Sequence, residues 1–324
     1  MGNFFTSLFS SGSSSKQEDE GAAKAKNEEK NFDILKYDGV RAQRMGKVAY
    51  AIKCYNEALA IKEDMETMDL LANAYTTIGD LPKAEEMISR LIALDPTQIS
   101  SRIARIHILF MQGKETQAIA DCDAVIAQDP NNALAYFLRG KAKRILGGQL
   151  NAIADVTKAI ALNEEFGAAY LFRAELLLLM RQGAAALADV DKAVALMPEE
   201  EIAYLLRGRI HGASKHWEAA QADFEQVLAL NPFSEEAMLS IGQLLVEQGK
   251  LDEALSYFDG LIEDEPTFAR AYSERGRVRN LKGDKQGAIE DLKKAIELNP
   301  KGEEAQRMNG QHSNFDHINK GGIY

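Results

Sequence analysis

The sequence predicts an all-α solenoid made of eight consecutive helical hairpins, each about 34 residues long. The segment AYFLRG begins at Ala135, and related segments begin at Ala169, Ala203 and Ala271, so the intervals are 34, 34 and 68 residues. Within each interval the apolar residues recur at spacings of three and four, which is the pattern of amphipathic helices. A fixed period of this length is typical of repeat proteins, in which each unit packs on its neighbours.

Eight units cover residues 32–300. Their first helices are predicted to begin near Phe32, Met65, Ile99, Ala133, Gly167, Glu201, Glu235 and Ala269. In six units a glycine stands between the two helices, where a helix C-terminus needs a left-handed residue: Gly46, Gly79, Gly113, Gly147, Gly249 and Gly283. The fifth unit has Gly183 two places later, and the sixth has Lys215 in the glycine position. Six units end on a proline, which stops the second helix: Pro96, Pro130, Pro198, Pro232, Pro266 and Pro300.

These features resemble the tetratricopeptide repeat. The 34-residue period, an early aromatic residue, a small residue four places later and a closing NP or DP all fit that family, and GDKQGAIEDLKKAIELNP (283–300) matches its second half. One alanine per unit occupies the position where the family's two helices approach each other: Ala51, Ala84, Ala118, Ala152, Ala186, Ala220, Ala254 and Ala288. The resemblance implies a right-handed superhelix, and it says almost nothing about function, because a fold alone does not define one.

An arginine three residues after the tyrosine position occurs in five units, and an aspartate follows each arginine after sixteen residues. The pairs are Arg105 and Asp121, Arg139 and Asp155, Arg173 and Asp189, Arg207 and Asp223, and Arg275 and Asp291. The other three units lack both residues. Because a lone buried charge is costly, we expect ion pairs within each unit. The alternative is a row of arginines that binds an anionic partner.

The resemblance implies that residues just after the tyrosine position face a concave groove. In the middle of the chain these residues are mostly apolar, with a few polar residues between them: Ile103, His107, Phe110, Phe137, Leu138, Lys141, Leu171, Phe172, Glu175, Leu205, Leu206 and Arg209. An exposed apolar strip favours a site for a peptide or an amphipathic helix. The alternative is that neighbouring repeats bury these side chains. The Lys and Asn clamp with which some relatives bind chaperone C-termini is incomplete, because Lys36 is followed by Val40 where the Asn belongs.

The two ends of the chain lack the repeat pattern. Residues 1–31 are predicted to be a disordered tail with a short aromatic segment, Asn3 to Phe9, that could bind the chain's own groove or a membrane. Gly2 fits the loose pattern for N-myristoylation. Residues 301–324 are predicted to be a partial capping helix followed by a flexible tail, and His312 and His317 in this tail form only a weak candidate for a metal site.

Composition and motifs narrow the function. The net charge of −11 argues against a nucleic-acid partner. Cys54 and Cys122 lie in apolar helical patterns and are expected to be buried free thiols. We find no catalytic motif, so we expect no cofactor and no enzyme activity. The sequence therefore predicts a cytoplasmic or membrane-peripheral protein-binding scaffold. The alternatives are a membrane-proximal adaptor and a self-associating spacer.

Overall fold

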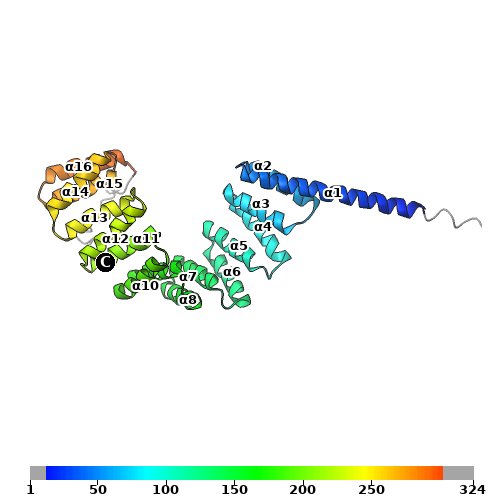
Figure 1. The fold of residues 1–324 in the computed structure, drawn as a ribbon, viewed down its shortest axis with the longest axis horizontal. Coiled ribbons are helices and arrows are strands. Elements are labelled where there is room, and N and C mark those ends of the chain that lie inside the picture. Colours follow the sequence, from blue (N-terminus) through cyan, green and yellow to red (C-terminus); the bar gives the residue numbers. More distant parts are fainter. Residues whose placement is uncertain (1–11, 302–324) are drawn as a thin grey trace, which may run out of the picture. The chain divides into compact units, whose positions relative to one another are not determined.

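The fold is known from a computed structural model that describes residues 12–301, with side chains from residue 26 onward. In this range the chain forms sixteen helices and no strand, arranged as eight antiparallel hairpins (Figure 1). The chain divides into two compact units after Leu162, with four hairpins in each.

The helices of unit 1 are α1 (Gly12–Arg44), α2 (Val48–Ile61), α3 (Met65–Thr77), α4 (Leu81–Leu94), α5 (Ile99–Met111), α6 (Glu115–Gln128), α7 (Ala133–Ile145) and α8 (Gln149–Leu162). The helices of unit 2 are α9 (Gly167–Leu179), α10 (Gly183–Leu196), α11 (Glu201–Ala213), α12 (Trp217–Leu230), α13 (Glu235–Glu247), α14 (Leu251–Asp264), α15 (Ala269–Leu281) and α16 (Lys285–Leu298). From α3 onward, every first helix begins at the residue where the 34-residue period places it.

Small residues let the two helices of each hairpin pack closely. The alanines at the predicted contact position are fully buried in the first seven hairpins, and Ala288 in the last is partly exposed. Several first helices also carry a glycine that faces a large side chain. A Cβ atom added to Gly242, for example, would lie 2.3 Å from Phe258 Cζ. In this hairpin the ring of Phe258 on α14 therefore packs directly against the backbone of α13.

The turns between the helices require a left-handed residue in all eight hairpins. The six predicted glycines all have positive φ, between 67° and 88°. In the fifth hairpin the turn does not move to Gly183, which begins α10; Arg181 takes a φ of 60° instead, and Lys215 takes 61° in the sixth. Hydrogen bonds that close the turn, such as the one from Arg181 N to Leu178 O, hold the backbone in this geometry whatever the side chain is.

Part of the N-terminal segment, predicted as a disordered tail over residues 1–31, is helical, because α1 already begins at Gly12. Low hydrophobicity argues against a packed core but not against a helix. The Ala, Lys, Glu and Gln residues of this segment are good helix formers. Phe32, the first buried residue of the helix for which burial is described, lies twenty positions after Gly12, or about 30 Å along a helix axis. The predictions for residues 1–11 and 302–324 lie outside the described part of the chain.

Candidate functional site

Five arginines of the first helices contact the aspartates that the sequence pairs with them. The shortest distance between guanidinium nitrogen and carboxylate oxygen is 2.5 to 2.7 Å in all five pairs. Each arginine uses both Nε and Nη2, which is the bidentate geometry of strong pairs. The five aspartates are 3 to 6% exposed, so these bonds join the two helices of a hairpin inside the protein.

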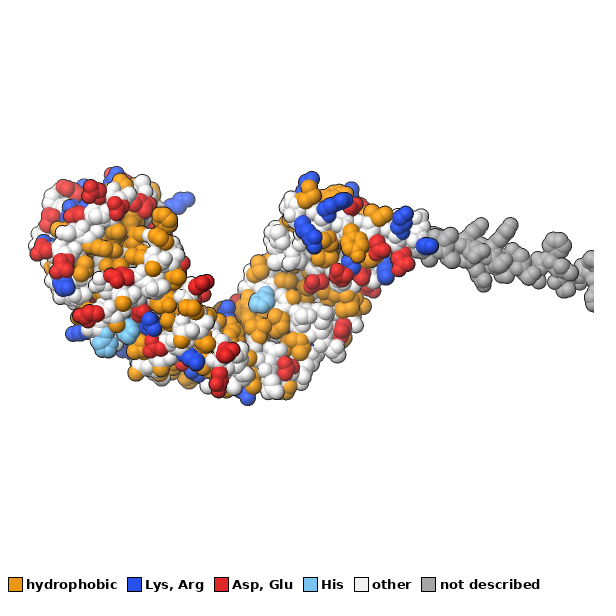
Figure 2. Space-filling model, in the orientation of Figure 1, with side chains coloured by type: hydrophobic (Ala, Val, Ile, Leu, Met, Phe, Trp, Pro, Cys, Tyr) orange, Lys and Arg blue, Asp and Glu red, His pale blue; other side chains and the backbone are white. Residues whose placement is uncertain are grey.

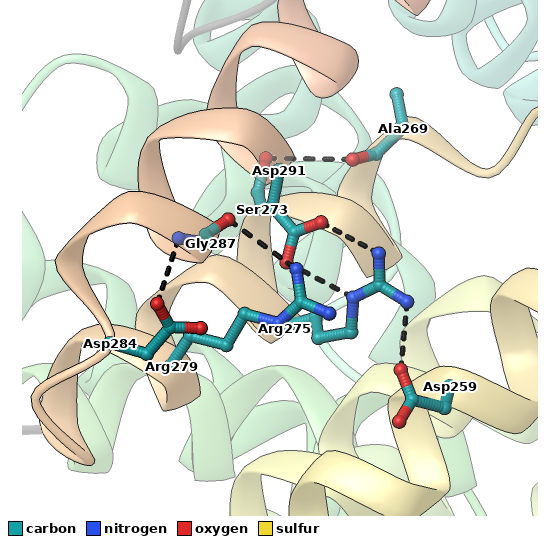
Figure 3. Close-up of polar contacts among 8 residues, drawn as sticks. All are labelled: Asp259, Ala269, Ser273, Arg275, Arg279, Asp284, Gly287 and Asp291. Atoms are coloured by element: carbon teal, nitrogen blue, oxygen red, sulfur yellow. Dashed lines mark hydrogen bonds and ion pairs between the residues drawn. The ribbon is translucent and has the colours of Figure 1, made fainter.

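Four of these arginines, Arg105, Arg139, Arg207 and Arg275, also contact the second helix of the preceding hairpin. Nη1 of Arg139 bonds Asp123 at 2.7 Å, and Nη1 of Arg275 bonds Asp259 at 2.7 Å (Figure 3). Arg207 bonds Asp191 in the same way, and Arg105 bonds the hydroxyl of Ser89. Sequence reasoning missed this second contact. Its signal was a polar residue sixteen places before each arginine.

These contacts shift the titration of the paired groups. Hydrogen bonds that the arginines donate to the aspartates raise the pKa of Arg105, Arg139, Arg207 and Arg275, and this effect outweighs the opposing effect of burial. Burial alone would raise the pKa of Asp155, but hydrogen bonds from Arg139 and Lys143 outweigh it and lower the pKa. The guanidinium groups are therefore committed to the fold, and they do not form an open row for an anionic ligand.

The tyrosine that precedes these arginines by three residues has a matching role. The guanidinium of Arg139 lies 5.2 Å from the ring centroid of Tyr136, and the corresponding distances in the other three tyrosine-containing hairpins are 5.3 to 5.8 Å. Such cation–π contacts hold the arginine in the orientation that reaches the aspartate of its own hairpin. The conserved part of the AYFLRG segment thus stabilises the repeat stack, so any binding function falls to the residues that vary.

In unit 1, the variable residues form an apolar surface on α5 and α7. Ile103, Phe110 and Phe137 are half-buried and pack against a core that includes Leu138. The ammonium of Lys141 lies over both phenyl rings, 6.0 Å from the centroid of Phe110 and 5.7 Å from that of Phe137. Hydrophobic side chains gather on the surface over these helices (Figure 2). We call Ile103, Phe110, Phe137 and Lys141 the α5–α7 patch.

Not every predicted groove residue is accessible. Leu138 is 3% exposed and Phe172 is 8% exposed, so both belong to the core, where the neighbouring helices enclose them. His107, Lys141 and Arg209 are exposed. The remaining predicted positions are half-buried: Ile103, Phe110, Phe137, Leu171, Glu175, Leu205 and Leu206. Two of the twelve groove predictions thus correspond to packing residues.

In unit 2, the corresponding face becomes polar toward its C-terminal end. Leu205 packs against a core that contains Phe224 and Leu244, while Arg209 one turn later pairs with Glu236. Farther along, Gln243 donates a 3.0 Å hydrogen bond to Glu274. The apolar surface is therefore concentrated on the earlier first helices of this unit.

The remaining candidate chemistry is structural. Residues 26–301 hold no group of His, Cys, Asp and Glu side chains suited to a metal ion, and His312 and His317 lie outside them. Cys54 and Cys122 are free and buried, and burial raises the pKa of Cys122 to about 12. None of the helices in the described part of the chain is both long enough and apolar enough to cross a membrane.

This architecture defines a helical-hairpin repeat protein. The sequence profile of the tetratricopeptide repeat matches residues 205–267 and 239–303. Residues 205–303 are thus tetratricopeptide repeats. The chain is also similar to tetratricopeptide repeat protein 36 of Danio rerio, with 45% identity over 60 residues, which is 18% of this chain. The match covers 32% of that relative, so the chain spans about a third of its length.

Solved structures support the fold. A tetratricopeptide repeat protein from Parabacteroides merdae has a TM-score of 0.57 at 19% identity and covers 75% of this chain and 96% of its own. PilW, a type IV pilus biogenesis factor, has a TM-score of 0.55 at 20% identity over 65% of this chain and 98% of its own. At these identities the likeness shows the fold alone. Proteins with this fold are typically non-enzymatic scaffolds for protein interaction.

Proposed function

We propose that this protein binds a peptide or an amphipathic helix of a partner protein along the variable face of its first helices. The observation that carries the proposal is the α5–α7 patch. Two phenyl rings and an isoleucine remain half-exposed at variable positions of the repeat, and Lys141 reaches across the rings without an acidic partner among the residues that the structure describes. Apolar surface beside a free cation suits a segment with apolar anchors and an acidic residue.

The test compares binding by matched variants. Phe137→Glu combined with Leu171→Glu places carboxylates on the variable face of each unit, at two half-buried positions. The control is Leu150→Glu on α8, where the leucine is 70% exposed and belongs to a second helix. Partners retained by the wild type and by the control should be lost by the double variant, with unchanged circular dichroism. Retention of every partner by the double variant would contradict the proposal.

A second candidate, a membrane-proximal adaptor, is favoured by the length of α1. A helix that begins at Gly12 places this residue about 30 Å along the axis from Phe32. Binding of residues 3–9 in the chain's own groove assumed a flexible tether, and the helix removes that premise for residues 12–31. Flotation with liposomes, comparing the intact chain with a version that lacks residues 1–12, tests this candidate. Equal flotation of the two would exclude it.

A further inference from the structure

A small hollow lies between α11 and α13 in unit 2. Its volume is about 250 Å³, which is less than the ~300–1,000 Å³ of sites that enclose a whole small ligand. Gly208 and Gly212 of α11 add no side chains to the lining, while Phe224 and Leu244 line the hollow with apolar surface. A cavity of this size and lining suits one long side chain of a bound polypeptide.

One carboxylate in this hollow is uncompensated. Oε2 of Glu247 lies 3.9 Å from the point where a Cβ atom on Gly212 would stand, so the carboxylate reaches from α13 toward α11. It has no hydrogen bond or ion pair with any residue that the structure describes. Glu247 is exposed to solvent, but partial desolvation beside the hollow raises its pKa, and the opposing influence of Arg277 is smaller. A carboxylate in this situation gains from a cation that arrives with a ligand.

The other charges at the hollow are already paired. Glu236 contacts Arg209, and it also contacts Arg270 at 3.1 Å. Arg277 bonds Glu274 at 2.8 Å. The amide nitrogen of Gln243 is used in its bond to Glu274, which leaves the amide oxygen as an acceptor. The hollow therefore offers one free negative charge and a free acceptor, and its cations are neutralised.

We infer that this hollow is a specificity pocket for a lysine or arginine side chain of the bound partner segment. The aliphatic stem would pack against Phe224 and Leu244, and the cationic head would meet Glu247, since long basic side chains bury their stems and keep their charge at a polar rim. The inference rests on the proposed function, and it adds a chemical requirement for the segment that occupies the groove.

Selection from a phage-displayed library of short random peptides on the full chain tests the inference. Enriched peptides should share a lysine or arginine at a fixed position. Glu247→Gln should weaken binding of a fluorescein-labelled selected peptide about tenfold, as expected for loss of a close charge pair. The matched control is Glu263→Gln, an exposed carboxylate on α14. Replacing the peptide's basic residue by norleucine should make its binding insensitive to Glu247→Gln.

A second variant tests occupancy of the hollow. Gly212→Ala would place a methyl group 3.4 Å from Leu244 Cδ1, an ordinary contact distance, so the fold is kept while the hollow shrinks. We expect weaker binding of the basic peptide and unchanged binding of the norleucine peptide. Enrichment of acidic or uncharged residues, or equal binding by the two glutamine variants, would overturn the inference. Peptides that lack a basic residue but are lost on Leu171→Glu would overturn it and leave the proposed function standing, whereas no enrichment would overturn both.

Discussion

Arg139 of α7 donates a 2.7 Å hydrogen bond to Asp123 of α6, and this bond ties the fourth hairpin to the third. The same guanidinium bonds Asp155 of α8, sixteen residues in the opposite direction along the chain. One side chain thus joins three helices, and because the period is constant the arrangement recurs at Arg207 and Arg275. It stabilises each hairpin and its contact with the previous one.

Loss of the arginine should destabilise the protein mainly through the carboxylate that it leaves behind. Arg139→Leu is expected to cost about 2 kcal/mol, which is less than the ~3–5 kcal/mol of a fully broken buried pair, because Lys143 lies 2.7 Å from Asp155 and still neutralises it. The double change Arg139→Leu with Asp155→Leu should recover much of this loss. Urea unfolding measures the change in the free energy of unfolding, and hydrogen exchange shows whether the loss of protection lies in α7 and α8.

The control for this prediction is an exposed pair. Lys53 and Glu57 lie 3.9 Å apart on the surface of α2, so Lys53→Leu should change the free energy of unfolding by less than about 0.5 kcal/mol. A double variant at Arg139 and Asp155 that is less stable than Arg139→Leu would show that the arginine acts by a different mechanism.

The contact between hairpins should be weaker than the contact within a hairpin. The side chain of Asp123 is 55% exposed, whereas that of Asp155 is 8% exposed. Asp123→Ser should therefore cost about 0–1 kcal/mol, since serine can accept the same bond, as Ser89 does from Arg105 at 3.0 Å. Asp155→Ser should cost clearly more in the same urea titration. Equal costs would mean that exposure does not separate the two contacts.

The period in the sequence predicted the hairpins and the five pairs because both depend on residues that recur. The starts of the first helices from Met65 onward could be predicted from the spacing of apolar residues alone. The paired absence of arginine and aspartate in three units pointed to the ion pairs. The contact of Arg139 with Asp123 was missed because its acceptor varies among aspartate and serine, so no single residue type marks it.

The groove was less predictable because a fixed position in the repeat does not fix exposure. Leu138 and Phe137 are neighbours in the sequence, yet Leu138 is core and Phe137 is half-exposed. The pocket at Glu247 could not be foreseen at all, since it depends on where Gly208 and Gly212 of one helix face the next. Such features arise from packing between neighbouring repeats, and the period of the sequence does not predict that packing.

Glycines inside the helices should respond to substitution according to the space beside them. Gly242→Ala should cost about 1–3 kcal/mol, because the new Cβ would lie 2.3 Å from the ring of Phe258, which must move. Gly260→Ala on α14 should instead increase the free energy of unfolding by roughly 0.5–1 kcal/mol. No atom lies within 4 Å of the new Cβ, and alanine favours the helix more than glycine does. Thermal or urea unfolding of both variants measures the difference. Stabilisation by Gly242→Ala would contradict the close approach.

Stability should fall at alkaline pH through Cys122. Its folded pKa of about 12 lies above the ~8.5 of an unfolded thiol, so the thiol favours the folded state below pH ~8.5, and this contribution is lost as the pH rises toward 12. Between pH 8 and 10.5 the wild type should lose about 2 kcal/mol more than Cys122→Ala. Tyr257, whose pKa burial also raises to about 12, affects both proteins equally. Urea unfolding at the two pH values checks this, and parallel losses would contradict it.

The two turns without glycine carry backbone strain that a single substitution should relieve. Lys215 has a φ of 61°, a left-handed conformation that costs a residue with a Cβ atom roughly 1–2 kcal/mol. Lys215→Gly should remove that cost but increase the entropy of the unfolded chain, so we expect a net gain in the free energy of unfolding of about 0.5–1 kcal/mol.

The reverse change, Gly249→Ala in the next hairpin, should lower stability, because Gly249 has a φ of 76°. Nothing lies within 4 Å of a Cβ atom at Gly249, so any loss there reports on the backbone and not on packing. Urea unfolding of the two variants should move in opposite directions, and movement in the same direction would show that the turns are not strained.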